Sequence, residues 1–362
     1  MIDSARRHLE RLVAFDTRNP PRSIPASGGI IDYLREALGS AFESEVIDLG
    51  DGCVNLFATR GRPRLLLNVH LDTVPAAEGW SSDPLVLRDD GERLIGLGAT
   101  DIKGAAAALL AALESTDDPV AVLFTTDEEA GESRCVRKFL EEFDRGEFDA
   151  TIVAEPTECR AVVAHRGLVT GVGAFHGVAG HSASGRALLD SAIHEAMRWG
   201  EAALTRAAAE ERRESFGLRG ICFNIGRVEG GVKPNMIATS ATVRWSARPR
   251  PGQSAASVRG FIESAASSVQ RVSWTPGFDG PALPTDDREE IQAAAEGWAR
   301  ARDLEIGAPV DFWTEAALFS AAGWPAIVLG PGHIGQAHTP DEYLSVAELN
   351  RAADTYARLL SF

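Results

Sequence analysis

The feature that most constrains the fold is an alternation of short apolar runs with helical segments between residues 64 and 155. Strands buried on both faces of a parallel sheet have continuous apolar runs of this length, whereas half-exposed strands alternate apolar and polar residues. Helical segments at 104–115 and 132–143 follow the first two runs. The runs are LLLNV (65–69), VAVLFTT (120–126) and ATIVA (150–154). This pattern predicts an α/β fold with a mostly parallel sheet.

The middle of the chain has a different pattern, with strands and helices in the order βαββαβ that is typical of a ferredoxin-like unit. In its third strand, Ala241, Val243, Trp245 and Ala247 fall on one face, so we expect that face to be buried. The expected strands are near 167–178, 220–228, 235–248 and 270–275, and the expected helices span 186–210 and 254–269.

The α/β pattern resumes after PALPTDD (281–287), a boundary rich in Pro and Asp. We expect a helix over 288–302, a strand over 326–330 and a final helix from about residue 346. A length of 362 residues corresponds to about two domains. The sequence therefore predicts a discontinuous α/β domain, residues 1–165 and 281–362, interrupted by an inserted domain at 166–280.

The balance of charges excludes a general binder of nucleic acid, because 36 Lys and Arg against 52 Asp and Glu give a net charge of −16. The first residues, MIDSARRHLERLVAFDTRN, predict an amphipathic helix rather than a signal peptide. No apolar run approaches the ~20 residues of a membrane span. The four cysteines are widely spaced, as free thiols in a reducing compartment would be. We therefore expect a cytoplasmic protein that binds neither membranes nor nucleic acid.

Potential metal ligands follow each of the three apolar runs, at the sheet edge where open α/β sheets carry their active sites. Two glycine-rich loops add Asp101, at a turn before a helix, and His338. Taken singly, each motif has an ordinary structural explanation, such as acidic residues in the first turn of a helix. Their joint occurrence predicts a metal site. The segments that follow the runs are His70-Leu71-Asp72, Asp127-Glu128-Glu129 and Glu155-Pro156-Thr157.

The donor groups favour zinc or cobalt, because imidazole and carboxylate without thiolate suit Zn²⁺ and Co²⁺. A carboxylate can bridge two such ions, which can activate a water molecule between them. Asp72 lies two residues after His70, on the same face of an extended strand, and can hold the imidazole in its ligating tautomer. The side chains of Glu128 and Glu129 diverge, so one can bind metal while the other acts as a general base.

Motifs in order along nearly the whole chain give the sequence a specific resemblance to a known family. They are NVHLDTVP (68–75), GLGATDIKGAAAAL (96–109), FTTDEEAG (124–131), VAEPT (153–157), GHSA (180–183) and QAHTPDE (336–342). The chain resembles the dinuclear zinc family of aminoacylases, glutamate carboxypeptidases, succinyl-diaminopimelate desuccinylases and acetylornithine deacetylases. FDTRNPPR, AHRG, FNIGRVEGG and VDFWTEAALFSAAG are most similar to its arginine-pathway branch, the acetylornithine and acetylcitrulline deacetylases.

The resemblance implies a zinc-peptidase-like catalytic domain with two divalent metal ions. His70 and Glu155 would bind one ion. Glu129 and His338 would bind the other, and Asp101 would bridge the pair.

The resemblance also implies roles for residues around these ligands. Asp72 would orient His70, and Glu128 would be the general base. The peptide bond between Asp101 and Ile102 would be cis. A Glu at position 155, where aminopeptidases of the family carry Asp, favours a deacylase.

By the same resemblance, the inserted domain would be a lid that forms a homodimer. His181 would reach the partner subunit's active site and stabilise the oxyanion, while Asn235 and Arg248 would contact the substrate. Two positions depart from the family pattern. No Pro follows the GHS motif shortly, and Ser246 stands where many relatives have Asp. Both lie on the substrate side, so they bear on the choice of substrate and leave the metal site intact.

The resemblance predicts a metal-dependent amidohydrolase that removes the acetyl group from N-acetylornithine or N-acetylcitrulline by attack of a metal-bridging water. It does not separate ornithine's ammonium from citrulline's ureido group. The first alternative is a succinyl-diaminopimelate desuccinylase or another N-acyl amino acid hydrolase. That desuccinylase branch tends to follow its GH motif with Tyr-Pro-His, where this chain has Ser182-Ala183-Ser184.

Three other classes fit the sequence less well. A catalytically inactive metal- or peptide-binding relative would have lost the base, and Glu128 is present. The GxGxxG at 330–335 follows a strand but runs into QAHTPDEY instead of opening a helix, as a dinucleotide site requires. A serine hydrolase is disfavoured because the chain has no GxSxG.

Overall fold

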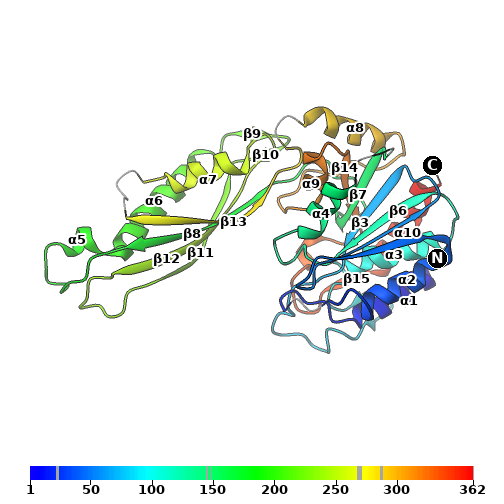
Figure 1. The fold of residues 1–362 in the computed structure, drawn as a ribbon, viewed down its shortest axis with the longest axis horizontal. Coiled ribbons are helices and arrows are strands. Elements are labelled where there is room, and N and C mark those ends of the chain that lie inside the picture. The colour runs from blue at the N-terminus through cyan, green and yellow to red at the C-terminus, as the bar shows by residue number, and fades with distance from the viewer. Residues whose placement is uncertain (22–23, 144–145, 147, 267–270, 286–287, 362) are drawn as a thin grey trace. The chain divides into compact units, whose positions relative to one another are not determined.

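The computed structural model describes residues 1–21, 24–143, 146, 148–266, 271–285 and 288–361 (Figure 1). The chain divides into two compact units. The first, called the α/β unit, comprises Met1–Val163, Glu290–Gly307 and Thr314–Phe362. The second, called the inserted unit, comprises Ala164–Glu289 and Ala308–Trp313. Beyond the range 166–280 expected for the inserted domain, this unit therefore also contains residues 164–165, 281–289 and 308–313.

The α/β unit is built on a six-stranded sheet in the order β1-β2-β6-β3-β7-β14. The last four of these strands are parallel, while β1 and β2 add an antiparallel edge. The prediction of a mostly parallel α/β sheet is therefore confirmed. The strands are β1 (Glu43–Asp48), β2 (Val54–Arg60), β3 (Leu65–His70), β6 (Val120–Thr125), β7 (Ala150–Pro156) and β14 (Ala326–Gly330).

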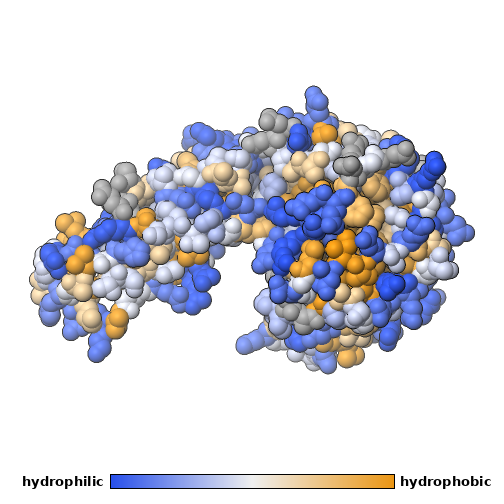
Figure 2. All heavy atoms as spheres, viewed as in Figure 1, coloured by the Kyte–Doolittle hydropathy of each residue, from blue (hydrophilic) through white to orange (hydrophobic). Residues whose placement is uncertain are grey.

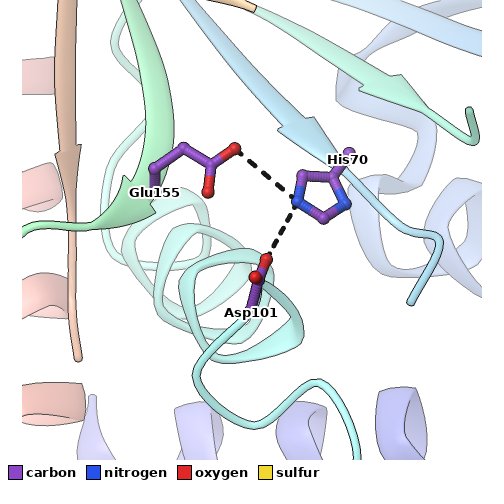
Figure 3. Close-up of side chains that lie close together, drawn as sticks. All are labelled: His70, Asp101 and Glu155. Carbon is purple, nitrogen blue, oxygen red and sulfur yellow. Dashed lines mark hydrogen bonds and ion pairs between the residues drawn. The ribbon is translucent and has the colours of Figure 1, made fainter. Parts of the chain in front are cut away.

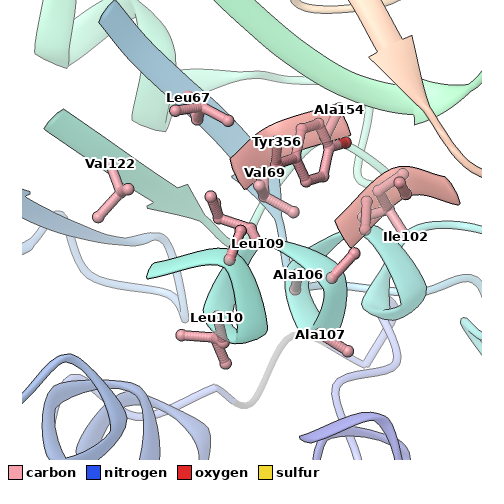
Figure 4. Packing of buried hydrophobic residues seen from close by; sticks show 14 of the residues in the cluster. Leu67, Val69, Ile102, Ala106, Ala107, Leu109, Leu110, Val122, Ala154 and Tyr356 are labelled. Atoms are coloured by element: carbon pink, nitrogen blue, oxygen red, sulfur yellow. The ribbon is translucent and has the colours of Figure 1, made fainter. Parts of the chain in front are cut away.

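Continuous apolar runs form the centre of this sheet because both of its faces are covered. Every residue of β3 and β6 is buried. All eleven residues of α3 (Lys103–Leu113) are buried as well, and α1 (Ile2–Val13) and α10 (Val346–Leu360) pack against it. Figure 4 shows Val69 of β3 beside Leu109 and Ala106 of α3. The alanines of α3 belong to the same hydrophobic core as the strands, so α3 and the loop before it are held against the sheet by this packing.

A second, small sheet ties the C-terminal part of the unit to the segment before α3. β15 (Tyr343–Ser345) pairs antiparallel with β5 (Arg93–Ile95), which pairs with β4 (Arg88–Asp89). The remaining elements are α2 (Gly29–Leu38), η1 (Gly39–Ala41), α4 (Arg134–Glu142), α8 (Glu289–Arg300), α9 (Ala316–Ala321) and η2 (Ile334–Gln336).

The inserted unit has the expected ferredoxin-like order. Its four-stranded antiparallel sheet has the order β11-β12-β8-β13. Ala241, Val243, Trp245 and Ala247 of β12 are at most 3% exposed and pack in one core with residues of α6 and α7, as the alternation predicted. The elements are β8 (Leu168–His176), α5 (Ala187–Asp190), α6 (Ala192–Ala209), β9 (Glu214–Ser215), β10 (Leu218–Arg219), β11 (Cys222–Gly230), β12 (Ser240–Arg248), α7 (Ala255–Glu263) and β13 (Val272–Gly280).

The expected boundaries in this unit are wrong at four places. The helix expected over 254–269 is α7, which ends at Glu263, and residues 267–270 of the expected helix and strand lie outside the described residues. The helix expected over 186–210 is two helices, α5 and α6, because Ser191 adopts an extended conformation between them. β12 starts at Ser240 instead of 235, and β13 continues past Pro276 to Gly280 through an irregular register. Within the residues that the structure describes, no helix is both long enough and apolar enough to cross a membrane.

Candidate metal centre

The first group of candidate ligands combines three buried side chains from three elements of the α/β unit. His70 ends β3, Asp101 precedes α3, and Glu155 lies near the end of β7 (Figure 3). The Nε2 atom of His70 is 3.1 Å from Oδ1 of Asp101 and 3.7 Å from Oε1 of Glu155. One imidazole and two carboxylates therefore point at a common position.

The second group shares Asp101 with the first. Nε2 of His338 is 3.3 Å from Oδ2 of Asp101 and 3.0 Å from Oε1 of Glu129. Within each group the ligand atoms lie within 4.8 Å of one another. Asp101 thus turns one carboxylate oxygen to each group, which is the arrangement of a bridging ligand. The peptide bond between Asp101 and Ile102 is cis, as the family resemblance implied.

The chemistry of these donors fits two divalent ions. Each group offers one imidazole nitrogen and carboxylate oxygens without thiolate, a set that suits zinc and cobalt. Burial, together with the negative charges of Asp101 and Glu129, raises the pKa of Glu155 well above its ordinary value. A cluster of buried carboxylates is costly unless cations compensate it, so bound divalent ions would stabilise this one.

In the metal-free protein, His70 and His338 compensate part of the negative charge of these carboxylates. Burial alone would lower the pKa of His70, but its hydrogen bonds with Asp101 and Asp72 and the charge of Glu155 raise it well above 6.5. Hydrogen bonds to Asp101 and Glu129 raise the pKa of His338 to about 10. The pKa of Asp101 is lowered because the hydrogen bonds from the two histidines outweigh the effect of its burial.

Asp72 supports the site from behind His70. Nδ1 of His70 is 3.0 Å from the main-chain oxygen of Asp72 and 3.5 Å from its Oδ1. A carbonyl oxygen only accepts, so Nδ1–H donates and Nε2 is left to face the ligand position. The Asp72 carboxylate accepts hydrogen bonds from the main-chain N–H groups of Glu128 and Glu129, at 3.3 and 3.0 Å, and from Nδ2 of Asn19 at 3.1 Å.

Glu128 lies beside the ligands without joining either group. Its pKa is raised well above 4.5, chiefly by burial and also by the charges of Glu129 and Glu155, against the opposing effect of His70. Among the described residues, no hydrogen bond to the Glu128 carboxylate contributes to this shift. A carboxylate with a raised pKa is a stronger base than an exposed glutamate, as a general base requires.

Three predicted site residues belong to the inserted unit. His181 is exposed, and its main chain pairs with Met236 in a β-bridge. Its Nδ1 accepts a hydrogen bond from Ala183 N at 3.1 Å, so a neutral imidazole carries its proton on Nε2. The main-chain oxygen of Asn235 accepts from Ser182 N at 3.2 Å, which brings Asn235 beside the 181–183 turn. Arg248 ends β12.

Two residues that support the site were not assigned a role from the sequence. Asn19 donates to Asp72, and the buried carboxylate of Glu342 accepts from the main chain around Asp101. Both lie in segments that were used only as family motifs, FDTRNPPR and QAHTPDE. The sequence signal for Asn19 and Glu342 is that each is a polar side chain with no assigned role inside one of these motifs.

The fold and this arrangement of ligands define a class of metal-dependent hydrolase. The chain belongs to Peptidase family M20/M25/M40, whose model matches residues 66–361. Solved structures share the fold over nearly the whole chain. A metallo-carboxypeptidase of this family from Sulfolobus solfataricus superposes with a TM-score of 0.74 at 14% identity, covering 97% of each chain. A tripeptidase from Staphylococcus aureus has a TM-score of 0.73 at 19% identity, covering 99% of this chain and 98% of its own.

Two sequence relatives are named deacetylases of N-acetyl amino acids. The chain is 49% identical over 369 residues to N-acetyl-L-citrulline deacetylase from Xanthomonas campestris, covering 100% of this chain and 98% of the relative. It is 29% identical over 365 residues to acetylornithine deacetylase from Erwinia tasmaniensis, covering 93% of this chain and 94% of the relative.

Proposed function

We propose that the chain hydrolyses the acetyl amide of an N-acetyl amino acid, with N-acetylcitrulline as its substrate and N-acetylornithine as the second candidate. The main support for amide hydrolysis is the pair of candidate ligand groups that share Asp101. Glu128 lies beside them and belongs to neither group, so its carboxylate is available as a base. The choice of citrulline rests on the 49% identity to a relative of that name over both full lengths, against 29% for an acetylornithine deacetylase.

In this proposal His70, Glu155 and Asp101 hold one divalent ion, while Glu129, His338 and Asp101 hold the other. Zinc is our first choice of metal and cobalt the second, because the donor set suits both. When bound, the ions supply Lewis-acid polarisation of the amide carbonyl and of the attacking water.

The side chains of the α/β unit then manage the proton. Glu128 takes a proton from the attacking water as the water oxygen bonds to the acetyl carbon. It passes this proton to the amide nitrogen, so that the C–N bond breaks and acetate and the free amino acid leave. Asp72 keeps Glu128 in place through the main-chain hydrogen bond at 3.3 Å, and it keeps Nε2 of His70 directed at the ligand position.

The inserted unit contributes recognition in this proposal. His181 carries a proton on Nε2 and would donate it as a hydrogen bond to the carbonyl oxygen as negative charge develops there. Asn235 and Arg248 would bind the substrate's carboxylate or backbone, since a guanidinium matches a carboxylate in geometry and charge.

We also propose that the protein is a homodimer formed through the inserted unit. Leu188 and Leu189 of α5 are each 70% exposed, Met197 of α6 is 67% exposed, and Val232 and Met236 are 82% and 50% exposed. Figure 2 shows apolar side chains at the end of this unit where Figure 1 places α5. Clustered exposed apolar side chains are rare on monomers and typical of interfaces.

The proposed location is the cytoplasm. All four cysteines lie in the part of the chain that the structure describes and none of them forms a disulfide, as is typical of proteins in a reducing compartment.

A panel of substrates tests the proposed activity. N-acetylcitrulline, N-acetylornithine, N-acetylglutamate, N-acetylmethionine and N-succinyl-diaminopimelate are hydrolysed in parallel, and kcat/KM is measured for each. We expect N-acetylcitrulline to have the highest value. A higher value for the succinyl substrate would replace the proposal by the desuccinylase alternative, and metal binding without any hydrolysis would favour an inactive relative.

Chelation tests the dependence on metal. Dialysis of the active protein against a chelator is expected to abolish turnover, because polarisation of the amide carbonyl and of the attacking water depends on the bound ions. Addition of Zn²⁺ or Co²⁺ is expected to restore it, whereas Mg²⁺, which prefers oxygen ligands in octahedral geometry, should not. Full activity in rigorously metal-free protein contradicts the proposal.

A further inference from the structure

Glu342 is a buried carboxylate that lies four residues after His338 and contacts the loop that carries Asp101. Its Oε1 accepts hydrogen bonds from the main-chain N–H groups of Thr100 at 2.8 Å and Asp101 at 2.9 Å. Its Oε2 accepts from Gly98 N at 3.0 Å. Main-chain N–H groups just before and at the shared ligand are therefore held by one side chain.

Further contacts join the same two segments. The main-chain oxygen of Glu342 accepts from Gly96 N at 3.0 Å, and Thr100 Oγ1 donates to the main-chain oxygen of Tyr343 at 2.6 Å. β15 continues this contact by pairing with β5. The segment that follows His338 is thus attached along the whole segment that leads to Asp101.

Burial and the charge of Asp101 raise the pKa of Glu342 to about 7, and its hydrogen bonds from main-chain N–H groups oppose this rise. Hydrogen bonds from N–H groups to a carboxylate are short and about twice as strong as those between neutral groups. Lys103, the first residue of α3, is fully buried and donates from Nζ to the main-chain oxygen of Phe15 at 2.9 Å. Burial lowers the pKa of Lys103 to about 7, and the charge of Glu342 opposes this shift. Three N–H donors from one stretch of main chain converge on the Glu342 carboxylate, so this side chain is placed to hold that stretch in position.

We propose that Glu342 is a positioning residue that couples the two metal sites. By holding the main chain at Asp101, it fixes the bridging carboxylate against both His70 and His338, so that the affinity of both sites depends on this one side chain. This inference rests on the proposed dinuclear function.

The geometry makes a distinctive prediction for the site at His70. Its ligands are His70, Glu155 and Asp101, and none of them lies on the 338–342 segment. A change at Glu342 reaches this site only through Asp101. A loss of affinity at both sites is therefore the mark of coupling, whereas a disturbed His338 segment alone would weaken only the second site.

The experiment is a calorimetric titration of Zn²⁺ into the full chain stripped of metal, comparing the wild type, Glu342→Gln and Glu342→Asp. Glutamine places an NH₂ group against a main-chain N–H donor, and aspartate is too short to reach all three donors. We expect two ions to bind to the wild type. Both variants are expected to bind both ions more weakly, by about the 10–100-fold that loss of a supporting residue costs at metal sites.

Asp341→Asn is the matched control. Asp341 is the preceding residue in the same loop, and its Oδ1 accepts from N and Oγ of Ser81, so its carboxylate is anchored away from the Asp101 loop. The control loses the same charge one position earlier and is expected to bind both ions as the wild type does.

Several outcomes overturn the coupling. One is that the Glu342 variants weaken only one of the two ions. Another is that they lower the thermal unfolding temperature of the metal-free protein while binding both ions with unchanged affinity, which makes Glu342 purely structural. If Glu342→Gln does not fold, Glu342→Asp decides by the same criteria. A wild type that binds no Zn²⁺ defeats the proposed function itself, and one that binds two ions without hydrolysing the substrates defeats only the activity.

Discussion

At the scale of single residues, Glu128 and Glu129 are neighbours that meet different surroundings. Glu129 Oε1 lies 3.0 Å from Nε2 of His338, whereas the Glu128 carboxylate lies beside the ligand groups without joining them. We expect Glu128→Ala to keep its bound metal while kcat falls by about the 10²–10⁴-fold of a lost general base. Metal content and steady-state kinetics measure the two effects. The matched variant Glu129→Ala should lose metal, and a collapse of metal occupancy in Glu128→Ala instead would reverse the two roles.

The titration of His338 predicts a pH dependence of metal binding. Its hydrogen bonds to Asp101 and Glu129 raise its pKa to about 10, so it is protonated at neutral pH in the metal-free protein. A ligating imidazole must be deprotonated, so metal binding releases this proton and the apparent affinity increases as the pH rises toward 10. Calorimetry at pH 7 in buffers with different ionisation enthalpies measures the released protons. Binding heats that are independent of the buffer contradict the assignment.

Side chains that follow a buried strand were the easiest candidate ligands to pick out from the sequence. His70, Glu129 and Glu155 were found because the apolar runs end beside them, and the structure brings them into two groups around Asp101. The contacts of Asn19 and Glu342 were not found, because they join segments 53 and 241 residues apart in the chain. No local pattern specifies which distant main-chain groups a buried carboxylate meets.

At the scale of elements, α3 shows how packing holds the shared ligand. Gly104, in its first turn, has no space for a side chain, since an added Cβ would lie 2.5 Å from Leu344 Cδ2 and closer still to the main-chain oxygen of Ala99. We expect Gly104→Ala to lower the free energy of unfolding by about 1–3 kcal/mol, the usual effect of overpacking. Urea denaturation of the metal-free protein measures it.

Gly297→Ala in α8 is the matched control for this prediction. The position is exposed, and an added Cβ would have nothing within 4 Å. Because alanine is a better helix former than glycine, we expect a stabilisation of up to about 1 kcal/mol. If Gly104→Ala and Gly297→Ala change the free energy of unfolding equally, the neighbours of Gly104 make room for the added Cβ without loss of stability.

The strands of the α/β sheet that were predicted from the sequence are all buried in the sheet. β3, β6, β7 and β14 are continuous apolar runs and were predicted, whereas β1, with the sequence ESEVID, is mostly exposed at the edge of the sheet and was missed. β2 was missed as well, since its pairing with β1 and β6 depends on the assembled sheet. The break between α5 and α6 was not predicted because the sequence on both sides of Ser191 is helical in character.

At the scale of the whole molecule, the strand order explains how one unit can be inserted in another. β8 and β13 are the first and last strands of the inserted unit and pair directly, with Leu168 opposite Gly280. The bridge between His165 and Leu283 extends this pairing outward. The chain therefore enters and leaves the unit at neighbouring positions, so the insertion requires no rearrangement of the α/β sheet. The order βαββαβ in the sequence was sufficient to predict this arrangement, because it implies that the two terminal strands of the unit meet.

The proposed dimer allows a test of whether His181 acts on the partner subunit's site. His181→Ala and Glu128→Ala chains are each expected to be nearly inactive, because one lacks the oxyanion donor and the other the base. If His181 acts in trans, a mixed dimer holds one site in which both groups are intact. Random exchange between equal amounts of the two chains makes half of the dimers mixed, so about a quarter of wild-type activity should return.

The matched control mixes Glu128→Ala with Glu128→Gln, a pair in which no arrangement of chains restores the base. Differently tagged chains and native mass spectrometry establish that subunits exchange in both mixtures. Recovery in the first mixture alone assigns the two groups of one site to different chains, because neither parent dimer contains a complete set. Demonstrated exchange without recovery would mean that His181 acts on its own chain's site or takes no part in the reaction. The exposed apolar residues of α5 and α6 would then serve association alone.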